Sequence, residues 1–321
     1  MINSVRNTVL AILNKNNYGY ISPQDFNLYA KQAQLDLFED YFYQYNYQVS
    51  KENARQSGTG YADIKKGYEE VIDLFSVTDF LSHQTSNRFF TPSLATTNSD
   101  YYLLNKVLVY PTILATGVND GVAVGMLEDL TSADFIAAGV KVGDIVANAT
   151  TGQVAFVGAV LSSQELELIN ADGTVADIFL NIGESYIVYN SSVIAEAEKV
   201  THSKITLLNR SLLTTPNNLY PAYTQQESLL TVFPNSINEV GGVECQYIRY
   251  PRDPQWTYTT LTGGEPVFNQ SNPSYQDFEL PIDDEYSLVS KILQFAGMSI
   301  REVTAVQFGG QLETLENQEE K

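Results

Sequence analysis

The spacing of apolar residues predicts two helices near the start of the chain, a short one and a long one, separated by a polar turn. The long helix, residues 23–45, has two apolar stripes. The first stripe contains Phe26, Ala30, Ala33, Leu37 and Tyr41. The second stripe, at heptad spacing, contains Leu28, Leu35 and Phe42. A helix that is apolar on two sides must be covered on two sides. We therefore expect Leu28, Leu35 and Phe42, with Tyr45, to face either the core or a neighbouring subunit.

The polar turn before this helix has the outline of a calcium-binding EF-hand loop, with Asn14 at the first position and Gly19 at the sixth. Calcium needs several carboxylates in such a loop, including a bidentate Glu at its end. Here the only anionic ligand position is Asp25. A helix start explains the same residues, with Ser22 as N-cap, Pro23 at the first helical position and Asp25 near the positive end of the helix. We expect a capped helical hairpin without metal. A calcium-regulated binding protein is an alternative that rests on this loop alone.

The middle of the chain, from about residue 117 to 190, has a different pattern. Charged residues become rare, and short alternating segments such as residues 165–169 are separated by Thr-Gly and Asp-Gly turns. This pattern predicts a small antiparallel β-domain. A strand is also expected at residues 101–114, interrupted at Pro111.

The pattern after this segment predicts a helix at residues 193–213, with Leu212 on its apolar side. Three strand-like runs follow at residues 220–224, 228–233 and 243–250, and we expect them to form an antiparallel meander. A closing helix is expected at residues 278–300, with three acidic residues in its first turn.

These elements predict an α+β fold. We expect a helical bundle formed from both ends of the chain, with an inserted small antiparallel β-domain and a β-meander. The first part of the helical domain would span residues 1–112 and the inserted β-domain residues 113–192. The second helical part, with the meander, would span residues 193–310. An acidic tail, residues 311–321, would be disordered or ordered only in an assembly.

The charge balance narrows the possible partners. The chain has 321 residues, with 38 acidic against 18 basic residues and a net charge of -20. A protein that grips nucleic acid by its phosphates needs a basic face. The acidity suits a surface that DNA passes without sticking, and it equally suits a simple contribution to solubility. The 21 tyrosines are typical of assembly interfaces.

Catalytic chemistry is not evident in the sequence. The only histidines are His83 and His202, each without a neighbouring histidine or cysteine, and no nucleophile elbow, phosphate-binding loop or zinc motif occurs. We expect no enzyme activity, cofactor or metal, although a hydrolase with two acids distant in sequence is an alternative. The single cysteine, Cys245, is expected to be a buried small hydrophobic residue. Because one cysteine cannot form an internal disulfide, we expect the protein to be synthesised in a reducing compartment. No signal peptide or membrane-spanning run is expected.

Several segments resemble structural proteins of short-tailed phages, including crAss-like phages of gut bacteria. They are NKNNYGYISPQDFNLYAKQAQLDLFEDYF, SLLTTP, VFPNSI, QYIRYPRDPQW and LPIDDEYSLVSKIL. The middle of the chain, from GVKVGDIVANATTG to GESYIVY, resembles β-modules of similar virion proteins. The overall pattern is most similar to a head-to-tail connector, which is a ring protein or adaptor stacked beneath the portal.

This resemblance implies a virion protein, made in the cytoplasm of a host bacterium, that forms a ring in the connector. Its partners would be further copies of itself in a cyclic homo-oligomer, usually of twelve, together with the portal protein and other tail or ring proteins. DNA would pass through without specific binding, and no membrane partner is implied. The alternative is a capsid auxiliary or tail-fibre attachment protein that binds its partner through the β-domain. The resemblance implies no catalytic residues.

Overall fold

The computed structural model describes residues 1–13, 21–55, 64–97 and 99–300. Contacts divide the chain into two compact units, and each is described separately. The terminal unit contains both ends of the chain, residues 1–75 and 250–321, and the central unit contains residues 76–249. The chain therefore passes between the units after Phe75 and after Arg249, whereas the expected domain boundaries lie after residues 112, 192 and 310.

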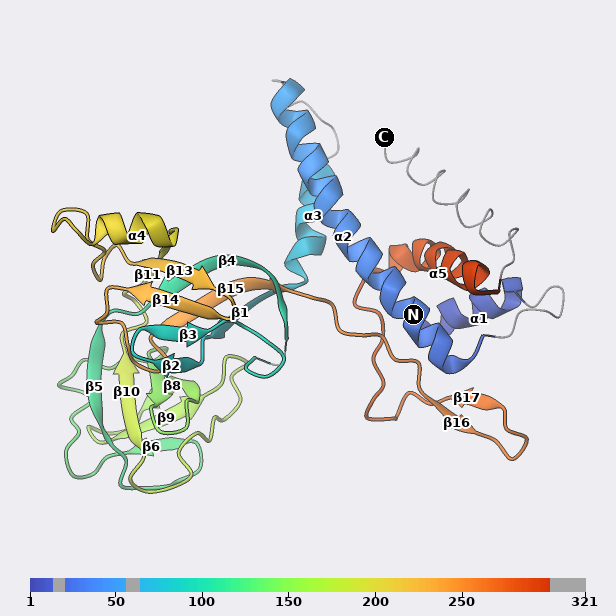
Figure 1. The fold of residues 1–321 in the computed structure, drawn as a ribbon. Helices are drawn as coiled ribbons and strands as arrows, with labels where there is room; N and C mark the ends of the chain where they lie inside the picture. The colour runs from blue at the N-terminus through green and yellow to red at the C-terminus, as the bar shows by residue number, and fades with distance from the viewer. Residues whose placement is uncertain (14–20, 56–63, 98, 301–321) are drawn as a thin grey trace. The chain divides into compact units, whose positions relative to one another are not determined.

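The terminal unit is mainly helical (Figure 1). Helix α5 packs against α1 and α2, and α3 packs against α2. A short 3-10 turn, η2, precedes α5, and a two-stranded hairpin joins β16 to β17. The bounds are α1 (Ile2–Leu13), α2 (Pro23–Arg55), α3 (Ile64–Asp73), β16 (Tyr258–Thr260), β17 (Pro266–Phe268), η2 (Ile282–Asp284) and α5 (Glu285–Ile300).

Aromatic side chains fill much of the core of the terminal unit. The Phe38 ring meets the rings of Phe42 and Phe75 edge-on, at centroid distances of 5.1 and 5.0 Å. Trp256 is buried beneath the Arg6 guanidinium, which lies 3.8 Å from the centre of its ring. The indole N–H of Trp256 donates a hydrogen bond to Asn3 at 3.0 Å. These contacts join the first helix to a segment that follows it by some 250 positions.

The start of α2 confirms the predicted cap. The backbone N–H of Asp25 donates to the Ser22 hydroxyl at 3.1 Å, and that hydroxyl donates to the Asp25 carboxylate at 2.6 Å. The helix then continues to Arg55, past the expected end at Tyr45. Most of the EF-hand-like loop, residues 14–20, lies outside the described residues. Within the described part of the chain, no group of three or more His, Cys, Asp and Glu residues could hold a metal ion.

The described residues of the central unit form three sheets. A four-stranded sheet has the order β1 (Ser76–Phe80), β15 (Val243–Arg249), β4 (Tyr101–Val109), β11 (Ala195–Glu196). A five-stranded sheet has the order β12 (Glu198–Lys199), β13 (Ala222–Gln226), β14 (Leu229–Phe233), β3 (Arg88–Phe90), β2 (His83–Thr85). A six-stranded sheet has the order β5 (Ile113–Val118), β10 (Ser185–Tyr189), β7 (Ile145–Asn148), β8 (Val154–Val160), β9 (Glu165–Ile169), β6 (Met126–Glu128). The short helix α4 (His202–Leu208) lies against β13 (Figure 1).

The four-stranded and five-stranded sheets share one apolar core. Alternate residues of their strands point into it, including Phe89, Val107, Leu230 and Val243. Cys245 lies in the same core, which confirms its predicted role as a small buried hydrophobe. Burial raises the pKa of its thiol to about 12, with a smaller contribution from the charges of Glu244 and Asp79. The protonated thiol is therefore strongly favoured while the unit is folded.

The six-stranded sheet has its own core and a set of buried polar side chains that bind its loops. The Asp129 carboxylate accepts hydrogen bonds from the Tyr186 hydroxyl at 2.7 Å and from the Ser132 hydroxyl and backbone N–H. The Asn148 side chain donates to Glu184 at 2.9 Å and accepts from two backbone N–H groups of the next turn. Short strands leave many loop amides without a ladder partner, and these side chains supply one.

The expected fold class is wrong. The structure is mostly β, with four sheets among the described residues, rather than a helical bundle with an inserted small β-domain. Four of the five described α-helices lie in the terminal unit, and the short helix α4 lies in the central unit. The reason is that the strands between residues 76 and 112 and between 193 and 249 pair with each other across long stretches of sequence, so they form sheets of the central unit. Local periodicity contains no information about such distant pairs.

Two individual elements also differ from expectation. The helix expected at residues 193–213 is limited to α4, because β11 pairs with β4 and β12 pairs with β13, and Thr201 then caps α4. The expected meander is also wrong in its third strand. β13 and β14 form a hairpin, but β15 leaves them and pairs with β1 and β4 in the other sheet. The strand interrupted at Pro111 is confirmed, since β4 ends at Val109 and β5 begins at Ile113.

Candidate interaction surfaces

The four candidate interface residues on α2 differ in how accessible they are. Leu28 is 63% exposed, whereas Leu35, Phe42 and Tyr45 are half-buried. Phe42 is held partly inward by its ring contact with Phe38. In the terminal unit taken by itself, Leu28 is the member of this set that presents a largely free apolar side chain.

Two tyrosines on the same helix are more exposed than most of that predicted set. Tyr43 and Tyr47 are 67% and 42% exposed, and their spacing of four residues places them on one side of α2. The apolar stripes predicted for residues 23–45 did not include Tyr43, and the expected helix ended before Tyr47. The accessible apolar surface of α2 is thus Leu28 near the start of the helix and the Tyr43–Tyr47 pair further along.

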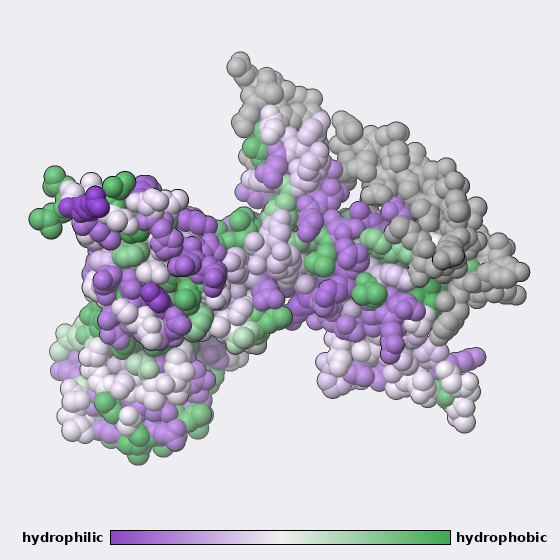
Figure 2. All heavy atoms as spheres, viewed as in Figure 1, coloured by the Kyte–Doolittle hydropathy of each residue, from purple (hydrophilic) through white to green (hydrophobic). Residues whose placement is uncertain are grey.

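The largest apolar exposure in the central unit is on the loop that follows α4, residues 209–220, here called the leucine loop. Leu212 and Leu213 are 100% and 97% exposed, and Leu219 and Tyr220 are also largely exposed. In Figure 2, hydrophobic atoms project from the end of this loop, beside the helix labelled α4 in Figure 1. Leu212 was expected on the buried side of a longer helix, and this expectation is wrong because the helix ends at Leu208.

Hydrogen bonds within the leucine loop fix its shape. The Thr215 hydroxyl donates to the carbonyl of Ser211 at 2.7 Å, and the Thr214 hydroxyl donates to the carbonyl of Leu208 at 3.0 Å. The Asn217 side chain accepts from the backbone N–H groups of Leu219 and Tyr220. Each leucine buried by a partner would contribute roughly 1.5–3 kcal/mol of hydrophobic stabilisation. An ordered loop presents this surface with little further loss of conformational entropy.

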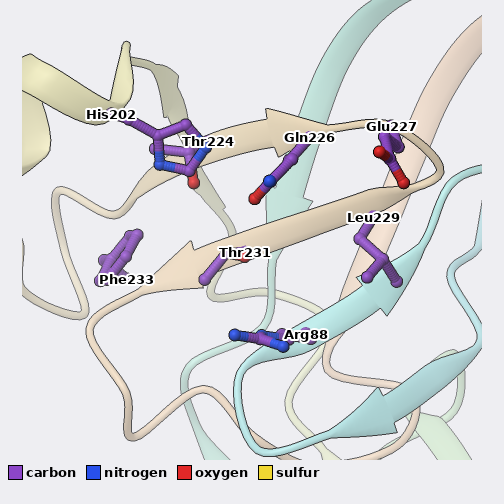
Figure 3. A pocket seen from close by; sticks show the side chains of 8 residues that line it. All are labelled: Arg88, His202, Thr224, Gln226, Glu227, Leu229, Thr231 and Phe233. Atoms are coloured by element: carbon purple, nitrogen blue, oxygen red, sulfur yellow. The ribbon is translucent and has the colours of Figure 1, made fainter.

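A separate pocket lies on the outer face of the five-stranded sheet, and we call it the sheet pocket (Figure 3). Its volume is about 500 Å³. The strands β13, β14 and β3 form its floor, and their register places Thr224 opposite Thr231 and Thr231 opposite Arg88. The opposite face of these strands bears the apolar residues of the shared core, so strand alternation sends this polar row outwards.

Two features of the sheet pocket are unusual. Thr224 is 1% exposed, and its hydroxyl oxygen is buried without a hydrogen-bond partner in the described part of the chain. A buried hydroxyl in this state costs about 1–3 kcal/mol. Glu227, at the turn between β13 and β14, has a φ of 52°, in the left-handed region that few residues other than glycine adopt. The exposed side chain of His202, the first residue of α4, also lines the pocket.

The sheet pocket does not contain a recognisable catalytic arrangement. His202 is the only histidine that lines it, and no cysteine or serine nucleophile is among its lining residues. Its Arg, His, Thr and Gln side chains supply hydrogen-bond donors, and the arginine adds a positive charge. Groups of this kind suit the binding of a ligand that accepts hydrogen bonds. Motifs and periodicity do not indicate this pocket, because its polar row combines the β13–β14 hairpin with β3, which lies more than a hundred residues earlier in the chain.

No protein-family model matches the chain, and no curated protein matches it. Within the described residues, no helix has both the length and the apolar character needed to cross a membrane.

Proposed function

We propose that this protein is a virion structural protein that forms a ring in the head-to-tail connector below the portal, where the ring provides a conduit for DNA. The observation that carries the proposal is the leucine loop. Its two outermost leucines are almost completely exposed on a loop held by its own hydrogen bonds. Exposed apolar groups on an ordered projection are typical of surfaces that another protein covers.

Further features support a repeated assembly rather than a single partner. Leu28, Tyr43 and Tyr47 add apolar surface on the terminal unit, so each unit has a candidate contact. Head-to-tail contacts between copies close into a ring when the rotation between neighbours divides a full turn. The net charge of -20 would keep DNA from adhering to such a conduit. The resemblance of both ends of the chain to connector proteins of short-tailed phages points to the same role.

The proposal is tested by assembly. The purified protein is examined by sedimentation velocity over a range of concentrations, and by negative-stain electron microscopy, alone and with virion portal complexes. We expect cyclic particles. The double variant Leu212→Ser/Leu213→Ser should lose them. The matched control Leu94→Ser/Leu180→Ser changes two leucines that are 66% and 62% exposed elsewhere in the central unit, and it should still assemble.

A wild-type protein that stays monomeric alone and with the portal would overturn the proposal. A leucine-loop variant that forms the same rings as the wild type would overturn the leucine loop as the contact that builds the ring. Single copies bound at the capsid surface or at a fibre would instead favour the alternative role of capsid auxiliary or tail-fibre attachment protein.

A further inference from the structure

We propose that the sheet pocket binds a single carboxylate group, carried either by a small organic acid or by an acidic side chain of a polypeptide. Three neighbouring strands each contribute one donor side chain to its floor: Thr224, Thr231 and Arg88 (Figure 3). Adjacent strands lie about 4.8 Å apart, so the backbone positions of Thr224 and Arg88 are roughly 10 Å apart, a gap that the long arginine side chain can bridge towards the threonines. The row is a product of strand register and does not depend on the leucine loop or on ring formation.

Arg88 supplies the positive charge. Its side chain is exposed at the pocket, and within the described part of the chain it has no hydrogen bond or ion pair. The chain has 38 acidic residues against 18 basic ones, so an arginine that none of the described carboxylates engages is notable. A planar guanidinium matches the two oxygens of a carboxylate and can donate two parallel hydrogen bonds to it.

Thr224 supplies an independent observation that points to a ligand. Its side chain is almost completely buried, and its hydroxyl oxygen has no hydrogen-bond partner in the described residues. Nearly all buried polar groups in folded proteins have such a partner. Rotation of the Thr224 side chain to another staggered position would let its hydroxyl donate a hydrogen bond to a carboxylate oxygen in the pocket. Thr231, half-buried between Thr224 and Arg88, can donate to the same group.

Glu227 favours a carboxylate over a phosphate. Its carboxyl group lines the same pocket and would repel a second negative charge on the ligand. A carboxylate has one charge, whereas phosphate near neutral pH has between one and two. Leu229 and Phe233 add apolar lining that can contact the methylene groups of an acidic side chain or a short organic acid. The volume of about 500 Å³ is ample for a ligand of this size.

The test uses the full chain with isotope-labelled Thr, Leu and Val methyl groups, followed by methyl NMR. The ligands are sodium acetate, glutamate blocked at both backbone ends, sodium phosphate, and sodium chloride at matched ionic strength. We expect saturable shifts of the Thr231 and Leu229 methyl signals with the two carboxylates. Tighter binding of the blocked glutamate would indicate a polypeptide side chain as the ligand, and equal binding would indicate a small organic acid.

The variants connect the shifts to the pocket. Arg88→Gln should weaken carboxylate binding by about tenfold or more, because it removes a charge-assisted pair of hydrogen bonds. Arg88→Lys keeps the positive charge but loses the forked geometry of the guanidinium. Its carboxylate affinity should therefore lie between those of the wild type and Arg88→Gln. The control Arg252→Gln removes an equal charge from an exposed arginine of the terminal unit and should leave binding unchanged. Shifts that match those in chloride, tighter binding of phosphate, or equal affinities of wild type and Arg88→Gln would each overturn the proposal.

Discussion

The two units of this protein use different means to hold their folds together. The terminal unit depends on apolar and aromatic side chains between helices, such as Phe38 against Phe75. The central unit combines apolar cores with buried carboxylates and amides, among them Asp129, Asn148 and Glu184. The two units should therefore respond differently to loss of apolar volume and to acid.

The difference follows from the backbone. A helix satisfies most of its own N–H and C=O groups, so its side chains are free to pack. The six-stranded sheet has short strands joined by long connections, whose amides lack ladder partners. Side chains supply those partners: Asp129 accepts from Ser132, Asn148 from Thr150, and Asp144 from Ser191. Polar residues are thus structural in the central unit, and their burial is no sign of catalysis.

The chain contains one natural reporter for each unit. The only tryptophan, Trp256, is buried in the terminal unit, and the only cysteine, Cys245, is buried in the central unit. Tryptophan fluorescence follows unfolding of the terminal unit, and thiol labelling under native conditions follows opening of the central unit.

Phe38→Ala should destabilise the terminal unit by about 4 kcal/mol, because it removes a buried aromatic side chain from the centre of its core. The tryptophan fluorescence transition should move to lower denaturant, while the protection of Cys245 from labelling should stay unchanged. Tyr43→Ala is the matched control on the same helix. Its side chain is 67% exposed, so we expect a change within about 0.5 kcal/mol. Equal loss of Cys245 protection in Phe38→Ala would show that the units unfold as one.

Asp129→Ala should destabilise the central unit by about 3 kcal/mol, because the Tyr186 hydroxyl and the Ser132 donors lose a charged acceptor inside the protein. Thiol labelling of Cys245 should accelerate, with the fluorescence transition of Trp256 unchanged. Tyr186→Phe removes only one of these hydrogen bonds and should cost less. Asp134→Ala, which removes an exposed carboxylate with one backbone hydrogen bond, should cost less than about 1 kcal/mol. The reverse order of the Asp129 and Asp134 effects would contradict the structural role of Asp129.

Acid should weaken the central unit more than the terminal unit. Burial opposes ionisation of Asp129, but hydrogen bonds from Tyr186 and Ser132 outweigh it and hold its pKa below the ordinary value. Side-chain hydrogen bonds from Thr131, Thr174 and Asn181 likewise lower the pKa values of Asp120, Asp172 and Glu184, respectively. In the terminal unit the corresponding described group is Asp277, where burial is outweighed by hydrogen bonds from Ile2, the N-terminal ammonium and Phe278.

The sign of this acid effect follows from linkage. A carboxyl group whose folded pKa is lowered stabilises the fold fully above its unfolded pKa, which is about 4. That stabilisation is lost as pH falls through the folded value. Asp79 acts in the opposite direction, because burial raises its pKa. Between pH 6 and pH 3, the stability reported by Cys245 should therefore fall more steeply than the stability reported by Trp256. Asp129→Ala should make the pH dependence of the Cys245 signal less steep. Equal slopes for the two reporters would contradict the comparison.

The smallest change in stability is expected for two buried threonines of the central unit, which differ in whether the hydroxyl group has a hydrogen-bond partner. Thr91 donates a hydrogen bond to the carbonyl of Ser228 at 3.2 Å, whereas the Thr224 hydroxyl has no partner among the described residues. Thr91→Val should therefore destabilise the unit by about 1 kcal/mol, and Thr224→Val should stabilise it by a similar amount. Thermal unfolding of the two variants checks the signs. Destabilisation by Thr224→Val in the absence of any ligand would show that its hydroxyl is hydrogen-bonded in solution.

Where short-range patterns decide the structure, the sequence was sufficient. The N-cap at Ser22, the strand break at Pro111 and the buried position of Cys245 follow from residues within a few positions of each feature. Capping, proline geometry and strand alternation are local, so they can be predicted without knowledge of the partners.

The tertiary structure alone decided which strands pair and which side chains stay exposed. Residues 195–199 suit a helix by composition, but β11 and β12 gain ladder partners that lie distant in the sequence. The same long-range pairing brings Arg88 beside Thr231. Helix α4 ends at Leu208, which leaves Leu212 and Leu213 on the loop beyond it. Pairing energy depends on the partner strand as much as on the strand itself. The fold class, the sheet pocket and the leucine loop therefore became visible only when the whole chain was in place.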